Sequence, residues 1–278
     1  MESKGLPSNH SNDNRENRVK RKEVLEKKKA MDELIKSASA DKDPLSSFPS
    51  FRHFDRNGLS IYLKSGCGDK LSSSIKQYIM RLLKANMEAP YGFEWPTEEK
   101  VKRSEMVAPE ARYIFVHEAP SASTSEILTM SERKRPSNNC VEDRGPMVGF
   151  VHYRFTLEEK IPVLYVYELQ LEPCVQAKGL GNFLMQLIEL IACKNRMSAV
   201  VLTVQKANSL AMNFYLNKLR IGENFVLVLS RYVVSTVSPS RVDPLIFVQL
   251  GIEKSYEILC KAFDHEAKAI LEVMIQTH

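Results

Sequence analysis

The first clear periodicity in the chain is a series of apolar residues that recur every three or four positions after residue 72. This spacing puts them on one side of a helix. We therefore predict a helix that begins at Ser73 and ends near Pro90, because proline disfavours helix continuation. Its apolar face consists of Ile75, Ile79, Leu82, Leu83 and Met87.

Shorter apolar or alternating runs predict a sheet with helices between its later strands. An Asn57-Gly58 turn precedes the first predicted strand, and a hairpin is predicted around residues 158–160. The predicted strands are 59–64, 112–117, 147–155, 163–171, 199–204 and 255–260, and further helices are predicted at 179–195, 208–219 and 261–275. From residue 147 the order is β-β-α-β-α-β, which indicates a mixed α/β (α+β) sheet.

The N-terminal region is polar and then strongly basic. Residues 1–14 are rich in Ser and Asn and are predicted to be disordered. Residues 41–49, with two prolines, are predicted to be a linker or an extended strap. Between these two segments, apolar residues near helical spacing predict a basic amphipathic helix. Its basic residues are Arg15, Arg18, Lys20, Arg21, Lys22, Lys27, Lys28 and Lys29. Residues 15–29 fit a nuclear-import signal, a contact with nucleosomal DNA, or a solvated helix packed along the domain.

Composition narrows the class of protein. The 278 residues are 44% apolar and 26% charged, as in a globular protein of one domain with an appendage. The net charge of +5 is too small to indicate nucleic-acid binding by itself. No apolar run approaches a membrane span and no signal sequence is recognisable, so we expect a protein of the nucleus and cytoplasm without membrane contact. Five scattered cysteines without a CxxC pair favour free thiols and no metal site.

One loop carries a pattern suited to anion binding. The strand 163–171 leads into a loop with Gly179 and Gly181, and a helix follows directly. Backbone N–H groups at a helix start attract a phosphate, and glycines let it approach the backbone. The sequence is not GxxxxGK[ST], which excludes a nucleotide-hydrolysing P-loop. By itself, however, the pattern also fits a tight strand-to-helix turn.

Two motifs in order resemble those of the GNAT acetyltransferases. They are Gln176-x-x-Gly179-x-Gly181 and, after an intervening strand, Asn208-x-x-Ala211-x-x-x-Tyr215. The resemblance implies the GNAT acyltransferase fold and acetyl-CoA as co-substrate. It implies that Asn208 contacts the pantetheine arm, and that the pyrophosphate is bound by Gln176, Ala177, Lys178, Gly179, Leu180, Gly181 and Asn182.

A closer resemblance is to the NatD family of histone-specific N-alpha-acetyltransferases. It is carried by Asp43-Pro-Leu-x-x-Phe-Pro49, Phe54-Asp-Arg-Asn-Gly-Leu59, Leu164-Tyr-x-Tyr-Glu168, Lys178-Gly-Leu-Gly181 and Ser255-Tyr-Glu-Ile-Leu259. This resemblance implies acetylation of the free α-amino group of histones four and two-A, which begin Ser-Gly-Arg-Gly. Histone tails are then the partners, and we expect a monomer. The expected division is a basic extension at 1–44, the catalytic domain at 45–263 and a C-terminal helix at 264–278.

The resemblance also implies roles for individual residues. Glu168 is the general base, and Tyr215 protonates the departing thiolate. The backbone of Leu169, Gln170 and Leu171 binds pantetheine, with the Leu169 N–H as oxyanion donor. The peptide substrate is expected to contact Tyr91, Tyr165, Tyr167, Thr203 and Tyr256. Tyr165 also fits a core position, and Tyr91, Thr203 and Tyr256 also fit a loop aromatic, a strand threonine and a core tyrosine. In a regular strand Glu168 would face away from both strand tyrosines, so we predict a β-bulge there.

Some features depart from these patterns or leave alternatives open. Thr156 stands where the family can carry an aspartate that clamps the basic third residue of the substrate. Residues 119–146 are a predicted disordered insertion, and 221–230 and 247–250 look like apolar inserts. An acyl-cysteine route through Cys174 lacks a histidine partner, so direct attack in a ternary complex is favoured. Acetylation of lysine or other amines, or a chromatin-binding role with an impaired site, remains an alternative.

Overall fold

A computed structural model describes residues 10–119, 145–219, 225–228 and 255–276, with side chains described from residue 17 to residue 271 outside β7. The strands are β1 (His53–Arg56), β2 (Leu59–Cys67), β3 (Arg112–Glu118), β4 (Met147–Glu158), β5 (Ile161–Leu171), β6 (Ala199–Gln205), β7 (Phe225–Val228) and β8 (Tyr256–Ala262). They form one sheet in the order β1-β2-β3-β4-β5-β6-β8-β7. Neighbouring strands are antiparallel except for the parallel pair β5 and β6.

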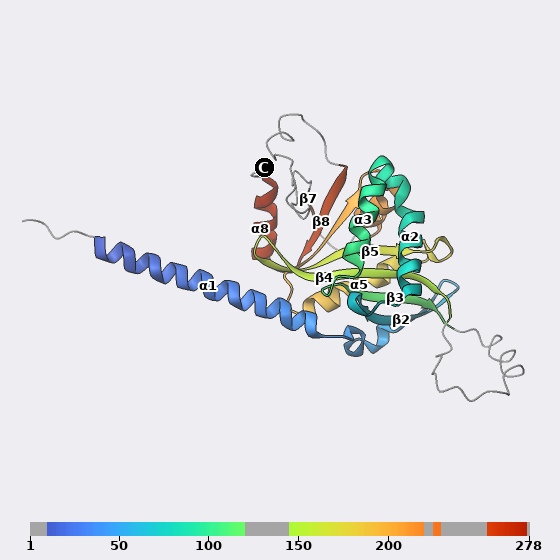
Figure 1. Ribbon diagram of the computed structural model, residues 1–278, viewed down its shortest axis with the longest axis horizontal. Helices are drawn as coiled ribbons and strands as arrows, with labels where there is room; N and C mark the ends of the chain where they lie inside the picture. The colour runs from blue at the N-terminus through green and yellow to red at the C-terminus, as the bar shows by residue number, and fades with distance from the viewer. Residues whose placement is uncertain (1–9, 120–144, 220–224, 229–254, 277–278) are drawn as a thin grey trace, which may run out of the picture.

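Helices cover both faces of this sheet (Figure 1). On one face lie α2 (Ser73–Tyr91) and α3 (Trp95–Met106), and on the other lies α5 (Leu180–Lys194). The remaining helices are α1 (His10–Ala40), α6 (Ser209–Asn213), a π-helical turn at Phe214–Lys218, and α8 (His265–Gln276). None of the helices in the described part of the chain is long and apolar enough to cross a membrane.

The apolar face of each helix explains how the layers pack. In α5, Leu180, Leu184, Leu187, Ile188 and Ile191 recur at helical spacing and are fully buried against the sheet. On the opposite face, α2 buries Ile79, Met80, Leu82 and Leu83 in a second cluster with residues of β3 and β4. The sheet therefore has a separate hydrophobic core on each side. Because both of their faces are covered, the central strands consist of nearly continuous runs of apolar residues.

Two tight turns connect antiparallel strands as the sequence predicts. Asn57 and Gly58 both have positive φ, 55° and 72°, between β1 and β2. Glu159 and Lys160, at 47° and 67°, do the same between β4 and β5. Two consecutive left-handed residues match the twist of the flanking strands. The predicted turn at Asn57-Gly58 and the predicted hairpin around 158–160 are confirmed.

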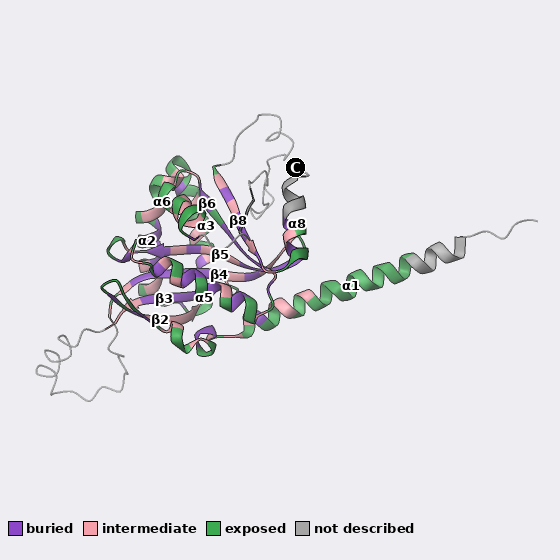
Figure 2. Ribbon diagram, turned by 180° about the vertical axis from the view of Figure 1, so that it is seen from behind, coloured by how far each residue is buried: buried purple, intermediate pink, exposed green. Residues whose placement is uncertain are grey.

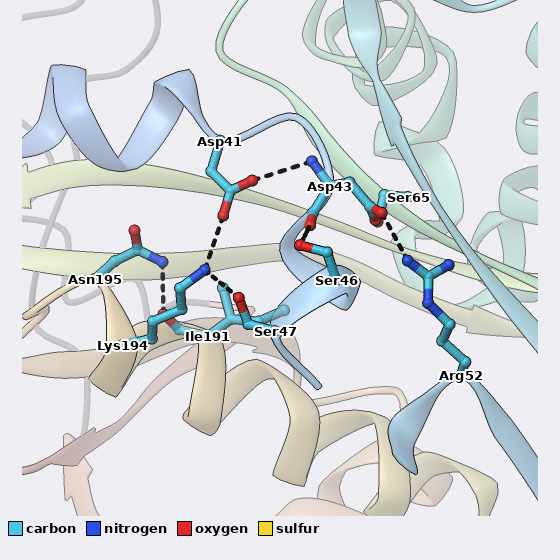
Figure 3. A network of polar contacts seen from close by, with 9 residues as sticks. All are labelled: Asp41, Asp43, Ser46, Ser47, Arg52, Ser65, Ile191, Lys194 and Asn195. Carbon is cyan, nitrogen blue, oxygen red and sulfur yellow. Dashed lines mark hydrogen bonds and ion pairs between the residues drawn. The ribbon is translucent and has the colours of Figure 1, made fainter. Parts of the chain in front are cut away.

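Polar contacts attach the segment after α1 to the domain (Figure 3). The Arg52 guanidinium lies 2.7 Å from the Asp43 carboxylate, which also accepts a 2.6 Å hydrogen bond from the Ser65 hydroxyl. These two donors outweigh partial burial and lower the pKa of Asp43. Lys194, at the end of α5, donates to Asp41 at 3.1 Å. Residues 41–52 thus form a strap with specific polar contacts, which is one of the two alternatives, a linker or an extended strap, that the sequence predicted for 41–49.

The structure corrects several boundaries. Residues 10–14 were predicted to be disordered, but they belong to α1. The predicted helix over 208–219 is the short α6 followed by the π-helical turn. Within the predicted insert at 221–230, Phe225–Val228 forms β7 and pairs with β8. The insertion at 119–146 and the insert at 247–250 lie largely or wholly outside the described residues.

Candidate active site

Strands β5 and β6 separate halfway along their length. They pair in parallel only from Val163–Ala199 to Val166–Leu202, although β5 continues to Leu171 and β6 to Gln205. Figure 1 shows β6 and β8 turning away from β5 at this end of the sheet. Beyond Val166, the β6-facing edge of β5 is without its ladder partner. This segment contains Leu169, Gln170 and Leu171, whose backbone can accept an extended ligand as an added strand.

A β-bulge lies at the start of this open segment. Glu168 pairs with His152 and Val166 pairs with Tyr153, so Tyr167 is an extra residue on β5. The bulge brings side chains that are adjacent in sequence onto the same face of the sheet. The Tyr165 and Tyr167 rings are 5.1 Å apart. Tyr167 also stacks at 5.0 Å on His152, the residue that pairs with Glu168. The predicted bulge is confirmed, and it places Glu168 and both tyrosines on the face covered by α2 and α3.

Glu168 is buried, with only 7% of its side chain exposed, and both of its oxygens have partners. The Lys102 ammonium of α3 lies 3.0 Å from Oε1. The Gln170 amide donates to Oε2 at 2.8 Å. The Asn86 side chain of α2 in turn donates to Gln170 Oε1, the side-chain amide oxygen, at 2.9 Å. The carboxylate is therefore fixed from β5, α2 and α3 together.

Lys102 is a cation within this buried group. Its side chain is 14% exposed, and its Nζ lies 3.2 Å from Glu105 as well as 3.0 Å from Glu168. Burial opposes the charge of the ammonium, but the neighbouring carboxylates and Tyr91 outweigh it, so the pKa of Lys102 is raised well above its usual value. Lys102 is protonated at neutral pH and cannot serve as a base there.

The residues expected to contact a peptide come from four elements. Tyr91 ends α2 with its ring 6.0 Å from Trp95, and burial raises the pKa of Tyr91 to about 12. The Tyr165 hydroxyl lies 2.5 Å from the Thr203 hydroxyl across the β5–β6 gap. Tyr256 begins β8 opposite Gln205. Tyr165 therefore has a polar partner and is more than a core residue. Trp95 is 3% exposed and belongs to the core.

The loop before α5 has the geometry that the glycine pattern suggests. Ala177 and Gly179 have positive φ, 58° and 86°, and Gly179 is the N-cap of α5 without a side-chain cap. A Cβ on Gly181 would lie 3.0 Å from the Phe214 ring, so only glycine fits comfortably. The first-turn N–H groups of α5 are left for an anion, as a pyrophosphate requires. The Gln176 side chain instead donates to the Leu171 carbonyl at 2.8 Å and holds the loop against β5.

Two residues of the second motif, Asn208 and Tyr215, lie at the start of α6 and in the π-helical turn that follows it. Asn208 caps α6 by accepting from the Ala211 N–H at 3.1 Å, and its amide contacts the Met87 sulfur. Tyr215 is half-buried in the π-helical turn. Burial, and then the charge of Glu168, raise the pKa of Tyr215 above its usual range. Its phenol is thus protonated at neutral pH, as a proton donor must be.

Part of the chain, including most of this site, matches a known protein family. Residues 88–219 match the acetyltransferase (GNAT) family, a segment that runs from the end of α2 to the π-helical turn. The mixed α/β sheet with helices on both faces is consistent with the GNAT acetyltransferase fold. The predicted fold class, a mixed α/β sheet of the GNAT type, is confirmed. Both the glycine loop and the bulge lie inside the GNAT segment, whereas α1, the strap and α8 lie outside it.

Three solved acetyltransferase structures are similar to the chain at low identity. The PaiA N-acetyltransferase of Thermoplasma acidophilum, solved with coenzyme A, is 15% identical over 74% of this chain and all of that one, with a TM-score of 0.42. NAA60 of Arabidopsis thaliana, solved with a bisubstrate analogue, is 12% identical over 73% and 99%, with a TM-score of 0.44. A putative streptothricin acetyltransferase of Bacillus anthracis with acetyl coenzyme A is 15% identical over 56% and 65%, with a TM-score of 0.32.

Lys102 is the main site residue that the sequence analysis missed. It lies on α3, a helix that was not predicted, between Tyr91 and the Arg112 strand. The pair formed by Asn86 and the Gln170 side chain was also missed, since only the backbone of Gln170 was considered. The spacing of Lys102 and Glu105, three residues apart, was the one available signal, and it is common on solvated helices.

Proposed function

We propose that this protein transfers the acetyl group of acetyl-CoA to the free α-amino group of protein N-termini, with histones that begin Ser-Gly-Arg-Gly as substrates. The observation that carries the proposal is the position of Glu168. Its carboxylate lies at a bulge beside the unpaired edge of β5, next to Tyr165 and Tyr167. An acceptor for a proton thus lies where the open strand edge can hold an acyl donor.

The described residues fit acetyl-CoA. The N-terminus of α5 and the loop with Gly179 and Gly181 suit its pyrophosphate, and the β5 edge from Leu169 to Leu171 suits the amides of its pantetheine arm. Bound there, acetyl-CoA supplies an activated thioester. The Leu169 N–H is the donor we assign to the carbonyl oxygen of that thioester.

The chain's own residues then handle two protons. A peptide α-ammonium group has a pKa of about 7.7–8.0, so a carboxylate within hydrogen-bond distance is a sufficient acceptor at neutral pH. Glu168 takes this proton directly or through a water molecule, and the amine attacks in a ternary complex. Tyr215, whose raised pKa keeps its phenol protonated, donates to the leaving thiolate.

The surroundings of Glu168 favour a basic peptide. Burial, and then the nearby carboxylates Glu105 and Glu94, raise the pKa of Glu98 despite the opposing charge of Lys102. Where burial and neighbouring carboxylates oppose the ionisation of a carboxyl group, binding of an additional cation beside it is electrostatically favourable. The third residue of Ser-Gly-Arg-Gly supplies one, and Glu98 is the carboxylate we assign to it in place of the aspartate that the family can carry at position 156.

The test uses two versions of a Ser-Gly-Arg-Gly-Lys peptide, one with a free N-terminus and one with an acetylated N-terminus. Purified protein and acetyl-CoA should acetylate the free peptide once, at its α-amino group, as located by tandem mass spectrometry. The blocked peptide should not react. Acetylation of the lysine in the blocked peptide would replace the proposal by side-chain acetylation. No reaction with either peptide would contradict acetyl transfer to this substrate.

A further inference from the structure

Lys102 has no part in the acetyl transfer described so far, yet it is the buried cation nearest to Glu168 in the described structure. Its Nζ lies 3.0 Å from Glu168 Oε1 and 3.2 Å from Glu105 Oε2. Surface ion pairs of this kind contribute little, but the two side chains here are only 14% and 7% exposed. Burying both charges is costly unless they meet in good geometry, so the pair needs an explanation.

We propose that Lys102 is a positioning residue, whose ion pair with the Glu168 carboxylate compensates the charge of that group and fixes its orientation beside the open edge of β5. The inference rests on the role of Glu168 as the proton acceptor in the proposed function. Lys102 acts only through Glu168 and is not itself in contact with the reacting atoms.

The hydrogen bonds around Glu168 fix its orientation as well as its charge. Lys102 occupies one carboxylate oxygen and Gln170 the other, and Asn86 holds Gln170 in place through a 2.9 Å hydrogen bond. A carboxylate offers about four lone-pair directions, two on each oxygen. With two of them engaged, one on each oxygen stays available for the proton of an incoming amine.

The environment explains why the carboxylate requires a cation. The Glu168 side chain is only 7% exposed, so water compensates little of its charge and a partner inside the protein is needed. Among the described residues, several titratable or charged groups interact with Glu168 or with the residues around it. They are Tyr91 of α2, Glu98, Lys102 and Glu105 of α3, Tyr113 of β3, His152 and Arg154 of β4, Tyr167 of β5, and Tyr215. Arg154 interacts with the Tyr167 ring at 4.3 Å and donates to the Glu105 carbonyl. Lys102 is therefore the cation that meets the Glu168 carboxylate directly.

His152 does not replace Lys102 in this role. It lies beside Glu168 in the β4–β5 register and is stacked between Tyr113 and Tyr167. Burial, and then the charges of Arg154 and Lys102, lower the pKa of His152 well below its usual value. The imidazole is thus neutral at neutral pH and supplies no charge to the carboxylate.

The test compares Lys102→Met, which keeps most of the side-chain volume and removes the charge, with Lys102→Arg, which keeps the charge. Lys100→Met is the matched control, because Lys100 is an exposed lysine on the same helix. In Lys102→Met we expect the acidic limb of the kcat/KM profile to move to higher pH, because the carboxylate loses the ammonium that lies 3.0 Å from it. At pH 7, kcat should fall about tenfold while the Kd for acetyl-CoA is unchanged. Lys102→Arg should restore most of the limb, and Lys100→Met should match wild type.

A second measurement does not depend on the peptide substrate. Protein labelled with ¹³C at the glutamate carboxyl carbon is titrated by NMR, and the Glu168 signal is assigned by its loss in Glu168→Gln. Its midpoint should lie higher in Lys102→Met than in wild type and should not move in Lys100→Met. This result decides the inference even if wild type fails to acetylate the Ser-Gly-Arg-Gly-Lys peptide, an outcome that would count against the proposed function alone.

An unchanged midpoint in folded Lys102→Met would overturn the inference. So would an unchanged acidic limb with kcat equal to wild type. If Lys102→Met does not fold, as judged by circular dichroism, Lys102→Gln and Lys102→Arg are compared in the same two measurements. A midpoint that is equal in these two variants would contradict the role of the charge.

Discussion

Glu168 lies on the face of the sheet that α2 and α3 cover because one residue, Tyr167, is inserted into β5 ahead of it. In an unbroken strand, successive side chains alternate between faces, so Glu168 would lie on the α5 side of the sheet. There it would be buried among Leu184, Ile188 and their neighbours without a cation. The bulge places it between Lys102 and Gln170 instead. Without this additional residue, Glu168 would be a destabilising buried charge; with it, Glu168 is a candidate base.

We predict that Glu168→Gln lowers kcat by more than about tenfold and leaves the Kd for acetyl-CoA within about twofold of wild type. The amide cannot accept the α-ammonium proton, while the loop before α5 is unaffected. Steady-state kinetics with the free peptide and calorimetric titration with acetyl-CoA measure the two quantities. Near wild-type turnover would remove Glu168 from the mechanism.

The matched control is Cys174→Ser. Cys174 is an exposed free thiol on the turn that follows β5, close to the glycine loop in sequence. It would be essential only if the acetyl group passed through a cysteine. Turnover equal to wild type is expected, and a loss as large as that of Glu168→Gln would favour the acyl-cysteine route.

Tyr215→Phe should lower kcat about tenfold, because the leaving thiolate loses its proton donor. The ring and its packing are kept, so neither thermal stability nor the Kd for acetyl-CoA should change much. Tyr62→Phe serves as the control, since Tyr62 lies on β2, far along the sheet order from the β5–β6 gap. Equal kcat values for the two variants would show that the Tyr215 hydroxyl is dispensable.

At the level of elements, the sequence predicted the parts whose periodicity is strong. The apolar stripe of α2, the strands of the β4–β5 hairpin and the apolar face of α5 all indicated the elements that are present. The bulge was predicted by combining strand alternation with the roles that the family resemblance implied, because two tyrosines and a glutamate with related roles could not share a face otherwise. The glycine loop was predictable because positive φ and close packing demand small residues.

Helix α3 was missed because it has no apolar stripe. Its buried residues are Trp95 and Met106, which stand at its two ends, and the residues between them are mostly charged or polar. Tertiary contacts hold this helix in place, among them the ion pairs of Lys102 with Glu168 and Glu105. Such contacts join residues far apart in sequence, so no local pattern could reveal them. The strands β1 and β7, of four residues each, were missed for lack of length.

The β1–β2 hairpin contacts the loop that we assign to the pyrophosphate. The Asn57 amide donates to the Lys178 carbonyl at 2.9 Å, and Phe54, in the same hairpin, packs against Phe183 of α5 with ring centres 5.0 Å apart. Gly179, the left-handed residue of the loop, lies next to both side chains. The hairpin thus fixes the loop from outside the GNAT segment.

We therefore predict that Asn57→Gly weakens acetyl-CoA binding by about three- to tenfold, the effect of losing one hydrogen bond. Glycine keeps the positive φ of the turn, so the hairpin itself should persist. Asn195→Ala is the control: its amide donates to the Ile191 carbonyl at 2.8 Å, at the opposite end of α5. Calorimetric titration should show a higher Kd for Asn57→Gly alone, and equal affinities would contradict a role for the hairpin.

On the scale of the whole molecule, α1 has one end that packs on the domain and a longer part that projects from it. Its last two turns pack on the domain through Leu34, Ile35 and Ala38, and Arg112 of β3 donates to the Ser39 carbonyl. Every described side chain from residue 17 to residue 30 is exposed, and the helix projects away from the sheet (Figure 2). The basic segment 15–29 lies in this projecting part, so its proposed contact with nucleosomal DNA or an import receptor does not compete with packing.

This division predicts different effects for two truncations. Every described side chain that is lost on removal of residues 1–30, from residue 17 onward, is exposed, so Tm should stay within about 2 °C of wild type. Removal of residues 1–40 also uncovers the sheet beneath Ala38 and leaves Arg112 without the Ser39 carbonyl. The loss of apolar burial and of one hydrogen bond amounts to about 2–3 kcal/mol, which corresponds to a Tm lower by about 5–10 °C in a domain of this size.

Differential scanning fluorimetry of the two truncated proteins beside the full chain measures both effects, and acetyl-CoA titration shows whether the site is intact in each. If the shorter truncation lowered Tm as much as the longer one, the projecting part of α1 would be contributing to the fold rather than serving a partner. If neither truncation lowered Tm, the packing of Leu34, Ile35 and Ala38 would not hold α1 to the domain. Because the strap contacts of Asp41 and Asp43 remain in both proteins, the comparison isolates the helix itself.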